Sequence, residues 1–119
     1  MRLPSFLREH PENRGGAESG ADGPKVRIRF RFVGTVQAVG FRWTTVNLAK
    51  AVGATGWVRN EPDGSVTAEI QGTATQVEQV VDGLDLQYNS TGWTDGFQIA
   101  AREYLPVVNG ELTFKVMYA

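Results

Sequence analysis

The chain has 119 residues, which suits one domain, with 41% hydrophobic and 21% charged residues and a formal net charge of -1. This charge balance argues against a general nucleic-acid binder, since such proteins carry a basic excess. The lack of cysteine excludes disulfides, thiolate nucleophiles and cysteine metal sites, and with His10 as the single histidine we expect neither a histidine-based catalytic dyad nor a zinc site.

The N-terminal segment, residues 1–24, is rich in Gly, Pro, Glu and Ser and holds few apolar residues. This composition predicts a disordered tail, and residues 25–119 are expected to form the folded domain. No apolar run approaches the roughly 20 residues of a membrane span, and the start does not resemble a signal peptide. We therefore expect a cytoplasmic protein that does not contact a membrane.

The first predicted strand is KVRIRFRFVG, residues 25–34, because apolar and basic residues alternate in it with a period of two. Its apolar residues should face the core, and its arginines, Arg27, Arg29 and Arg31, should face solvent. A helix is predicted to follow and to stop at Gly53. Its buried face recurs with helical spacing and consists of Phe41, Thr45, Leu48, Ala49 and Val52.

Two further strands, residues 55–60 and 65–72, are predicted on either side of the turn EPDG, whose Pro and Asp-Gly residues favour a hairpin. A second helix is expected over residues 73–84, with Thr73 or Thr75 as its cap. Residues 85–96 are polar and predict a loop. The last two strands are expected near 97–105 and 111–118, the second with an alternating set of apolar residues, Leu112, Phe114, Val116 and Tyr118.

The element order is therefore β-α-β-β-α-β with an extra strand at the C-terminal end. Each helix connects two strands, and the apolar faces of both helices need a common partner. A mainly antiparallel sheet with both helices on one face satisfies them, which predicts an α+β, ferredoxin-like α/β sandwich.

The loop before the first helix, within GTVQAVGFRW at residues 34–43, combines small residues with an arginine. Such a loop exposes backbone N–H groups, and the helix start adds its own. Arg42 adds a cation in the first turn, where cations are disfavoured unless an anion is present. These features favour a site for a phosphate-sized anion. The alternative is a tight turn whose arginine reaches solvent or pairs with an acid.

GTVQAVGFRW resembles the acylphosphatase signature, in which a Gly-x-Val-Gln-Gly-Val-x-Phe-Arg loop leads into the first helix. LAKAVGATGWVRNEPDGSVTAEIQG resembles the second conserved block of that family, Gly-Trp-Val-Arg-Asn followed by a Pro-Asp-Gly turn. The resemblance extends over about residues 26–84, and the family fold is the sandwich predicted above. It implies an enzyme that hydrolyses acyl phosphates to a carboxylate and inorganic phosphate, with no cofactor and no metal.

The resemblance places the family's catalytic arginine at Arg42 and its catalytic asparagine at Asn60. The loop that cradles the phosphate would comprise Gly34, Gln37, Ala38, Val39, Gly40 and Phe41. Arg42 and the loop amides would hold the phosphoryl oxygens, and Asn60 would orient a water in line with the leaving group. From its position alone, Asn60 could instead cap the EPDG turn.

One residue departs from the family pattern, because Ala38 stands where the family has glycine. At a positive φ, alanine would cost on the order of 1 kcal/mol and could tilt an amide away from the phosphate. At a negative φ nothing is lost. The departure keeps open a catalytically weakened, anion-binding module with the acylphosphatase fold.

An RNA-binding domain of the same fold is a further alternative. RNA recognition on such a sheet uses aromatic residues that stack on bases, whereas the outward side of the first strand carries arginines. These arginines are expected to pair with acids such as Glu69 across the sheet. We therefore expect a small acyl phosphate or inorganic phosphate as the partner, no nucleic acid, and a monomer.

Overall fold

The computed structural model describes residues 20–37, 40–90 and 96–118. In chain order its elements are β1 (Lys25–Gly34), α2 (Phe41–Val52), β2 (Thr55–Asn60), β3 (Val66–Thr73), α3 (Ala74–Asn89), β4 (Phe97–Leu105) and β5 (Phe114–Met117). The predicted order of strands and helices is confirmed. Of the predicted tail, residues 1–19 lie outside the described residues, and the carbonyl of Gly20 accepts a hydrogen bond from the Thr73 hydroxyl.

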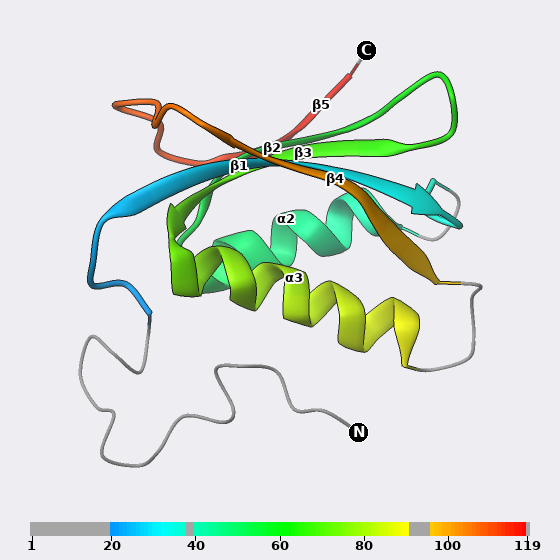
Figure 1. Ribbon diagram of the computed structural model, residues 1–119, viewed down its shortest axis with the longest axis horizontal. Helices are drawn as coiled ribbons and strands as arrows, with labels where there is room; N and C mark the ends of the chain where they lie inside the picture. Colours follow the sequence, from blue (N-terminus) through cyan, green and yellow to red (C-terminus); the bar gives the residue numbers. More distant parts are fainter. Residues whose placement is uncertain (1–19, 38–39, 91–95, 119) are drawn as a thin grey trace.

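The five strands form one sheet in the order β4-β1-β3-β2-β5. The pairs β1–β3, β1–β4 and β2–β3 are antiparallel, whereas β5 lies parallel to β2. Helices α2 and α3 lie side by side on one face of this sheet (Figure 1). The predicted ferredoxin-like sandwich is confirmed. We call the sheet face that points away from both helices the open face.

The core lies between the sheet and the helices, because every second residue of β1, β2 and β3 points toward α2 and α3. An aromatic cluster closes the core near the start of α2. The ring of Phe41 lies 5.1 Å from that of Phe32, 5.4 Å from that of Phe97 and 5.2 Å from that of Tyr88, measured between centroids. Burial of Phe41 in this cluster fixes where α2 begins relative to the end of β1.

Helix α3 is longer than predicted, because it continues to Asn89 through residues that the sequence indicated as a loop. Tyr88 lies one helical turn after Leu84 and is buried on the same face. The Asn89 amide donates to the Asp85 carboxylate at 2.9 Å, which supports the last turn. The predicted cap is confirmed at Thr73, whose hydroxyl accepts from the backbone N–H of Gln76 at 3.2 Å. No helix in the described part of the chain is long and apolar enough to cross a membrane.

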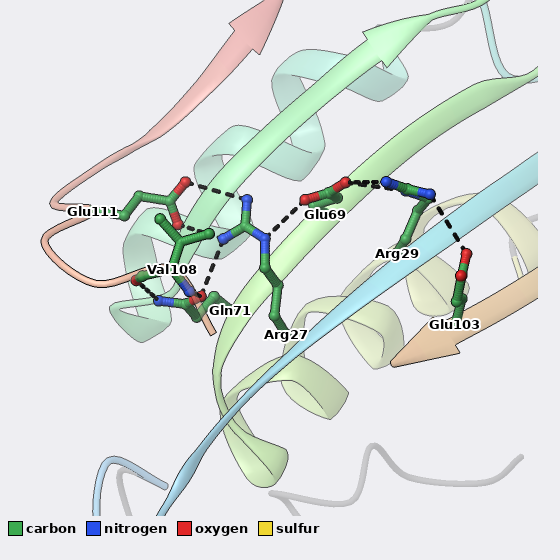
Figure 2. A network of polar contacts seen from close by, with 7 residues as sticks. All are labelled: Arg27, Arg29, Glu69, Gln71, Glu103, Val108 and Glu111. Carbon is green, nitrogen blue, oxygen red and sulfur yellow. Dashed lines mark hydrogen bonds and ion pairs between the residues drawn. The ribbon is translucent and has the colours of Figure 1, made fainter. Parts of the chain in front are cut away.

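Strand β5 is shorter than predicted, and Leu112 is 86% exposed rather than part of an alternating strand. The chain before β5 is instead held across the end of the open face. The Gln71 side chain accepts from the Val108 N–H at 2.8 Å and donates to the Val108 carbonyl at 2.9 Å. Figure 2 shows this contact beside Glu111, which binds Arg27.

The prediction that Arg27 faces solvent is wrong, since only 3% of this residue is exposed. Its guanidinium donates to Glu69 at 2.8 Å, to Gln71 at 3.1 Å and to Glu111 at 2.8 Å (Figure 2). The segment that carries Glu111 covers it, and this long-range contact has no local sequence signal. Arg29 conforms to the prediction, because it is partly exposed and pairs with Glu69 at 2.9 Å.

Candidate active site

Those predicted functional residues that the structure describes lie where the carboxyl ends of three strands meet the start of α2. Strands β1 and β2 both run antiparallel to β3, so they point the same way, and β5 runs parallel to β2. Phe32 near the end of β1 and Asn60 at the end of β2 both lie opposite Val66. We call the carboxyl ends of β1, β2 and β5, together with the first turn of α2, the site edge.

The loop after β1 is anchored at its first residues. The Thr35 N–H donates to the Gly96 carbonyl at 3.1 Å, and Val36 is buried. Gly34 has a φ of 112°, and a Cβ there would lie 2.7 Å from the Gly96 carbonyl oxygen. Both its conformation and its surroundings therefore require glycine.

The Gln37 side chain ties this loop to the β2–β3 hairpin. Its Nε2 donates to the Glu61 carbonyl and to the Ser65 carbonyl, both at 2.8 Å. The sequence indicated Gln37 only as a backbone amide donor, so this clamp was missed. A long amide side chain in a loop of small residues was the available signal. The clamp places the loop beside Asn60, which directly precedes Glu61.

The start of α2 leaves its positive end open. Gly40 precedes the helix with a φ of 75°, no side chain of the described residues caps the helix, and no acidic residue lies in its first turn. The Thr44 N–H bonds the Gly40 carbonyl at 3.0 Å. The predicted loop donors Ala38 and Val39 lie outside the described residues, and with them the sign of φ at Ala38, so their roles remain predictions.

Arg42 lies in this first turn, half-buried, and its guanidinium carbon is 5.6 Å from the centroid of the Tyr118 ring. It forms no ion pair with any carboxylate of the described residues. Strand β5 pairs with β2 up to Met117 opposite Arg59, and Tyr118 and Asn60 are the residues that directly follow this last pair. The structure thus brings Arg42 and Asn60 to the same edge, and Tyr118, which the sequence indicated only as a strand residue, lies there too.

Asn60 presents an unused hydrogen-bond acceptor at this edge, because its Oδ1 is buried and has no partner among the described residues. A buried acceptor without a donor costs about 1–3 kcal/mol, so its retention calls for an explanation. The EPDG turn is capped instead by Asp63, whose Oδ1 accepts from the Ser65 N–H at 3.0 Å and the Ser65 hydroxyl at 2.6 Å. The alternative in which Asn60 caps this turn is therefore wrong.

The carboxylates next to Asn60 in the sequence are poor general bases. Hydrogen bonds from Thr67 and Arg59 hold the pKa of Glu61 below its usual range. Hydrogen bonds from Ser65, together with Arg31, lower the pKa of Asp63 further. Both groups are therefore ionised and bound at neutral pH, which suits a base poorly. Arg59 points to the face opposite Asn60, as alternation predicts, and pairs with Glu61 at 2.9 Å.

Arg42 has no carboxylate partner in the described ranges, in contrast to the other arginines there. Each of those has a carboxylate within ion-pair distance, and the pairs are Arg27–Glu69, Arg29–Glu69, Arg31–Asp63, Arg59–Glu61 and Arg102–Glu78. The guanidinium at the site edge therefore keeps its charge and its donors available for an anion.

Sequence comparisons identify the family to which the chain is similar. The family model for acylphosphatases matches residues 28–92. An acylphosphatase from Thermococcus kodakarensis is 47% identical over 57 residues, which cover 48% of this chain and 63% of the relative. One from Methanothrix thermoacetophila is 37% identical over 91 residues, 76% of this chain and 96% of the relative. The first three relatives are matched over only 55–63% of their own lengths.

A solved structure shares the fold. The crystal structure of an acylphosphatase from Bacillus subtilis superposes with a TM-score of 0.64 and 23% identity, covering 78% of this chain and 99% of that one. At this identity the likeness supports the arrangement of strands and helices alone. The site edge itself offers a free guanidinium, an open helix start and an unpaired amide oxygen, a set suited to binding an anion and orienting a water.

Proposed function

The chain belongs to the acylphosphatase family, and we propose that it hydrolyses the carboxyl–phosphate bond of small acyl phosphates to a carboxylate and inorganic phosphate. One observation carries the proposal. A guanidinium with no carboxylate partner among the described residues and a buried amide oxygen with no donor, those of Arg42 and Asn60, lie at the same edge of the sheet.

In this proposal the protein binds and stabilises the phosphoryl group. Arg42 and the backbone N–H groups of the loop and helix start, from Gln37 to Phe41, donate to its oxygens. The carboxylate is a stable leaving group, so positioning and charge stabilisation account for most of the catalysis. Gln37 contributes its side chain differently, because its clamp on the hairpin keeps the loop beside Asn60.

Asn60 orients the attacking water, since its free Oδ1 can accept one hydrogen of that water. The water oxygen attacks phosphorus, the bond to the carboxyl oxygen breaks, and the bonding pair leaves with the carboxylate. The water's proton goes to a phosphoryl oxygen. A substrate oxygen is the better acceptor, because neighbouring Glu61 and Asp63 are ionised and already bound to arginines.

Two alternative functions remain to be compared with this proposal, a phosphate-binding module and an RNA-binding domain. Ala38, in place of the family's glycine, keeps open a module that binds phosphate with little turnover. RNA binding is disfavoured, because the arginines of the open face, Arg27, Arg29, Arg31 and Arg59, are each paired with a carboxylate. Phosphates of RNA would have to displace those carboxylates.

The test is hydrolysis of benzoyl phosphate in the presence of a chelator. We expect turnover that inorganic phosphate inhibits competitively, because product and substrate share the phosphate site. Phosphate binding without turnover supports the weakened module instead. A protein that neither hydrolyses benzoyl phosphate nor binds inorganic phosphate contradicts the proposal and that alternative together.

We further propose that the protein acts as a monomer in the cytoplasm. The internal ion pairs of the open face support the monomer, since they leave no concentrated charge on that face to attract a partner. Sedimentation should give one species near 13.0 kDa, the mass of a single chain. A stable dimer at micromolar concentration would contradict the monomer.

A further inference from the structure

We propose that Tyr118 is a positioning residue, whose ring holds the Arg42 guanidinium in the place where it binds the phosphoryl group. This inference rests on the proposed function of the site edge. It assigns a role to a residue near the C-terminal end of the chain, far from both sequence motifs.

The contact between the two residues has the geometry of a cation–π interaction. The guanidinium carbon lies 5.6 Å from the ring centroid, within the roughly 6 Å over which such contacts attract. A ring attracts the cation through its face and places no carboxylate oxygen on its N–H groups. The five donors of the guanidinium stay free for an anion, which they would not in a salt bridge.

Two other arginines show what is particular about this contact. Arg59 lies 4.9 Å from the ring of Trp57, and Arg102 lies 4.9 Å from the ring of Phe30. Both also reach a carboxylate, Glu61 at 2.9 Å and Glu78 at 3.9 Å, respectively. Within the described ranges, Arg42 is thus the arginine held by an aromatic ring without a competing anion.

The position of Tyr118 follows from the sheet rather than from the core. Side chains alternate along β5, so Tyr118 lies on the same side as buried Phe114, which is the side that α2 covers. Yet Tyr118 is 74% exposed. Burial therefore does not account for an aromatic residue here, whereas a ring face turned to Arg42 does.

A held guanidinium should bind phosphate more tightly, because less side-chain freedom is lost when the anion arrives. The gain applies to substrate, transition state and product phosphate alike, since all three carry the phosphoryl group. Losing the ring should therefore raise KM and the dissociation constant for phosphate by the same factor and leave kcat almost unchanged. A residue that only stabilised the fold would not produce this pattern.

The experiment compares Tyr118→Leu, which removes the ring, with Tyr118→Phe, which keeps it. Calorimetric titration with inorganic phosphate should show a dissociation constant about 2- to 30-fold higher for Tyr118→Leu, the range expected for a cation–π contact. Tyr118→Phe should bind like wild type. Tyr104→Leu is the matched control, since Tyr104 is 69% exposed on β4 and contacts no part of the site edge, and it should also bind like wild type.

Equal phosphate affinity of Tyr118→Leu and wild type would overturn the inference. Loss of affinity in Tyr118→Phe as large as in Tyr118→Leu would also overturn it, because the hydroxyl rather than the ring would then matter. The titration needs no turnover. A wild type that binds phosphate without hydrolysing benzoyl phosphate would contradict the proposed activity and still leave the role of Tyr118 measurable.

Discussion

The open face of the sheet and the site edge treat their polar groups in opposite ways. On the open face, buried Arg27 donates to Glu69, Gln71 and Glu111, so its charge is matched (Figure 2). At the site edge, and among the described residues, Arg42 contacts an aromatic ring without a carboxylate, and the Asn60 Oδ1 has no hydrogen-bond donor. A satisfied network fixes a structure, whereas a guanidinium without a carboxylate and an amide oxygen without a donor, among the described residues, suit the binding of a ligand at the site edge.

The first test of this contrast is to remove Arg27, which lies at the centre of the hydrogen-bond network on the open face. Arg27→Ala should lower the free energy of unfolding by about 3–5 kcal/mol, because it leaves buried acceptors without their cation. Arg29→Ala is the matched control on the same strand. Arg29 is partly exposed, so we expect a loss of at most about 1 kcal/mol. Urea denaturation measures both, and equal losses would contradict the buried network.

Asn60→Ala should lower activity without lowering stability, because it removes a side chain that acts on the substrate rather than one that supports the fold. We expect kcat for benzoyl phosphate to fall about 10²–10³-fold, as for the loss of one preorganised hydrogen-bonding group. The free energy of unfolding should stay level or rise, since a buried acceptor without a partner disappears. Asn109→Ala, in an exposed turn, provides the control. Full activity in folded Asn60→Ala would exclude water positioning by this residue.

The Gln37 clamp supports the site edge, since it ties the loop after β1 to the hairpin that follows β2. Gln37→Leu removes both hydrogen bonds and should lower kcat/KM for benzoyl phosphate about tenfold, the equivalent of one to two ordinary hydrogen bonds. Gln98→Leu replaces an exposed glutamine on β4 and should change nothing. Unchanged kinetics in Gln37→Leu would mean that the loop keeps its place without the clamp.

A smaller effect is expected from pH. Burial opposes ionisation of Glu69, but hydrogen bonds from Arg27 and Arg29 outweigh it and lower its pKa. A lowered pKa in the folded state adds stability above the unfolded-state pKa of about 4.3, and this stability is lost as the pH falls through the folded value. Wild type should therefore exceed Glu69→Gln in stability at pH 7 and lose that advantage in acid. An advantage that does not change with pH would contradict this pairing.

The sequence predicted those parts of the fold that depend on local patterns. Strand β1 follows from alternation, the hairpin of β2 and β3 follows from its turn residues, and α2 is capped at Gly53 as predicted. The end of α3 was missed because polar residues on its exposed face masked the helical spacing of Leu84 and Tyr88. Burial of Arg27 was missed because Glu111, far along the chain, covers it.

The same distinction between local patterns and long-range contacts applies to the candidate site. Motifs place Arg42 and Asn60 in the sequence, but their common edge depends on the pairing of β2 with β5. The side-chain contacts of Gln37 and Tyr118 join residues distant in the sequence, so local spacing holds no information on them. Such long-range contacts are identified from the folded structure rather than from local spacing in the sequence.

The central claim is that Arg42 has no carboxylate partner among the described residues because its guanidinium binds the phosphoryl group of the substrate. The most direct test compares kcat/KM for benzoyl phosphate in Arg42→Ala and Arg29→Ala, two variants that each remove one arginine. We predict a loss on the order of 10³–10⁵-fold for Arg42→Ala, as for other arginines that stabilise a transferring phosphoryl group, with folding retained. Arg29→Ala should keep wild-type activity. Equal activities of the two variants would contradict the account.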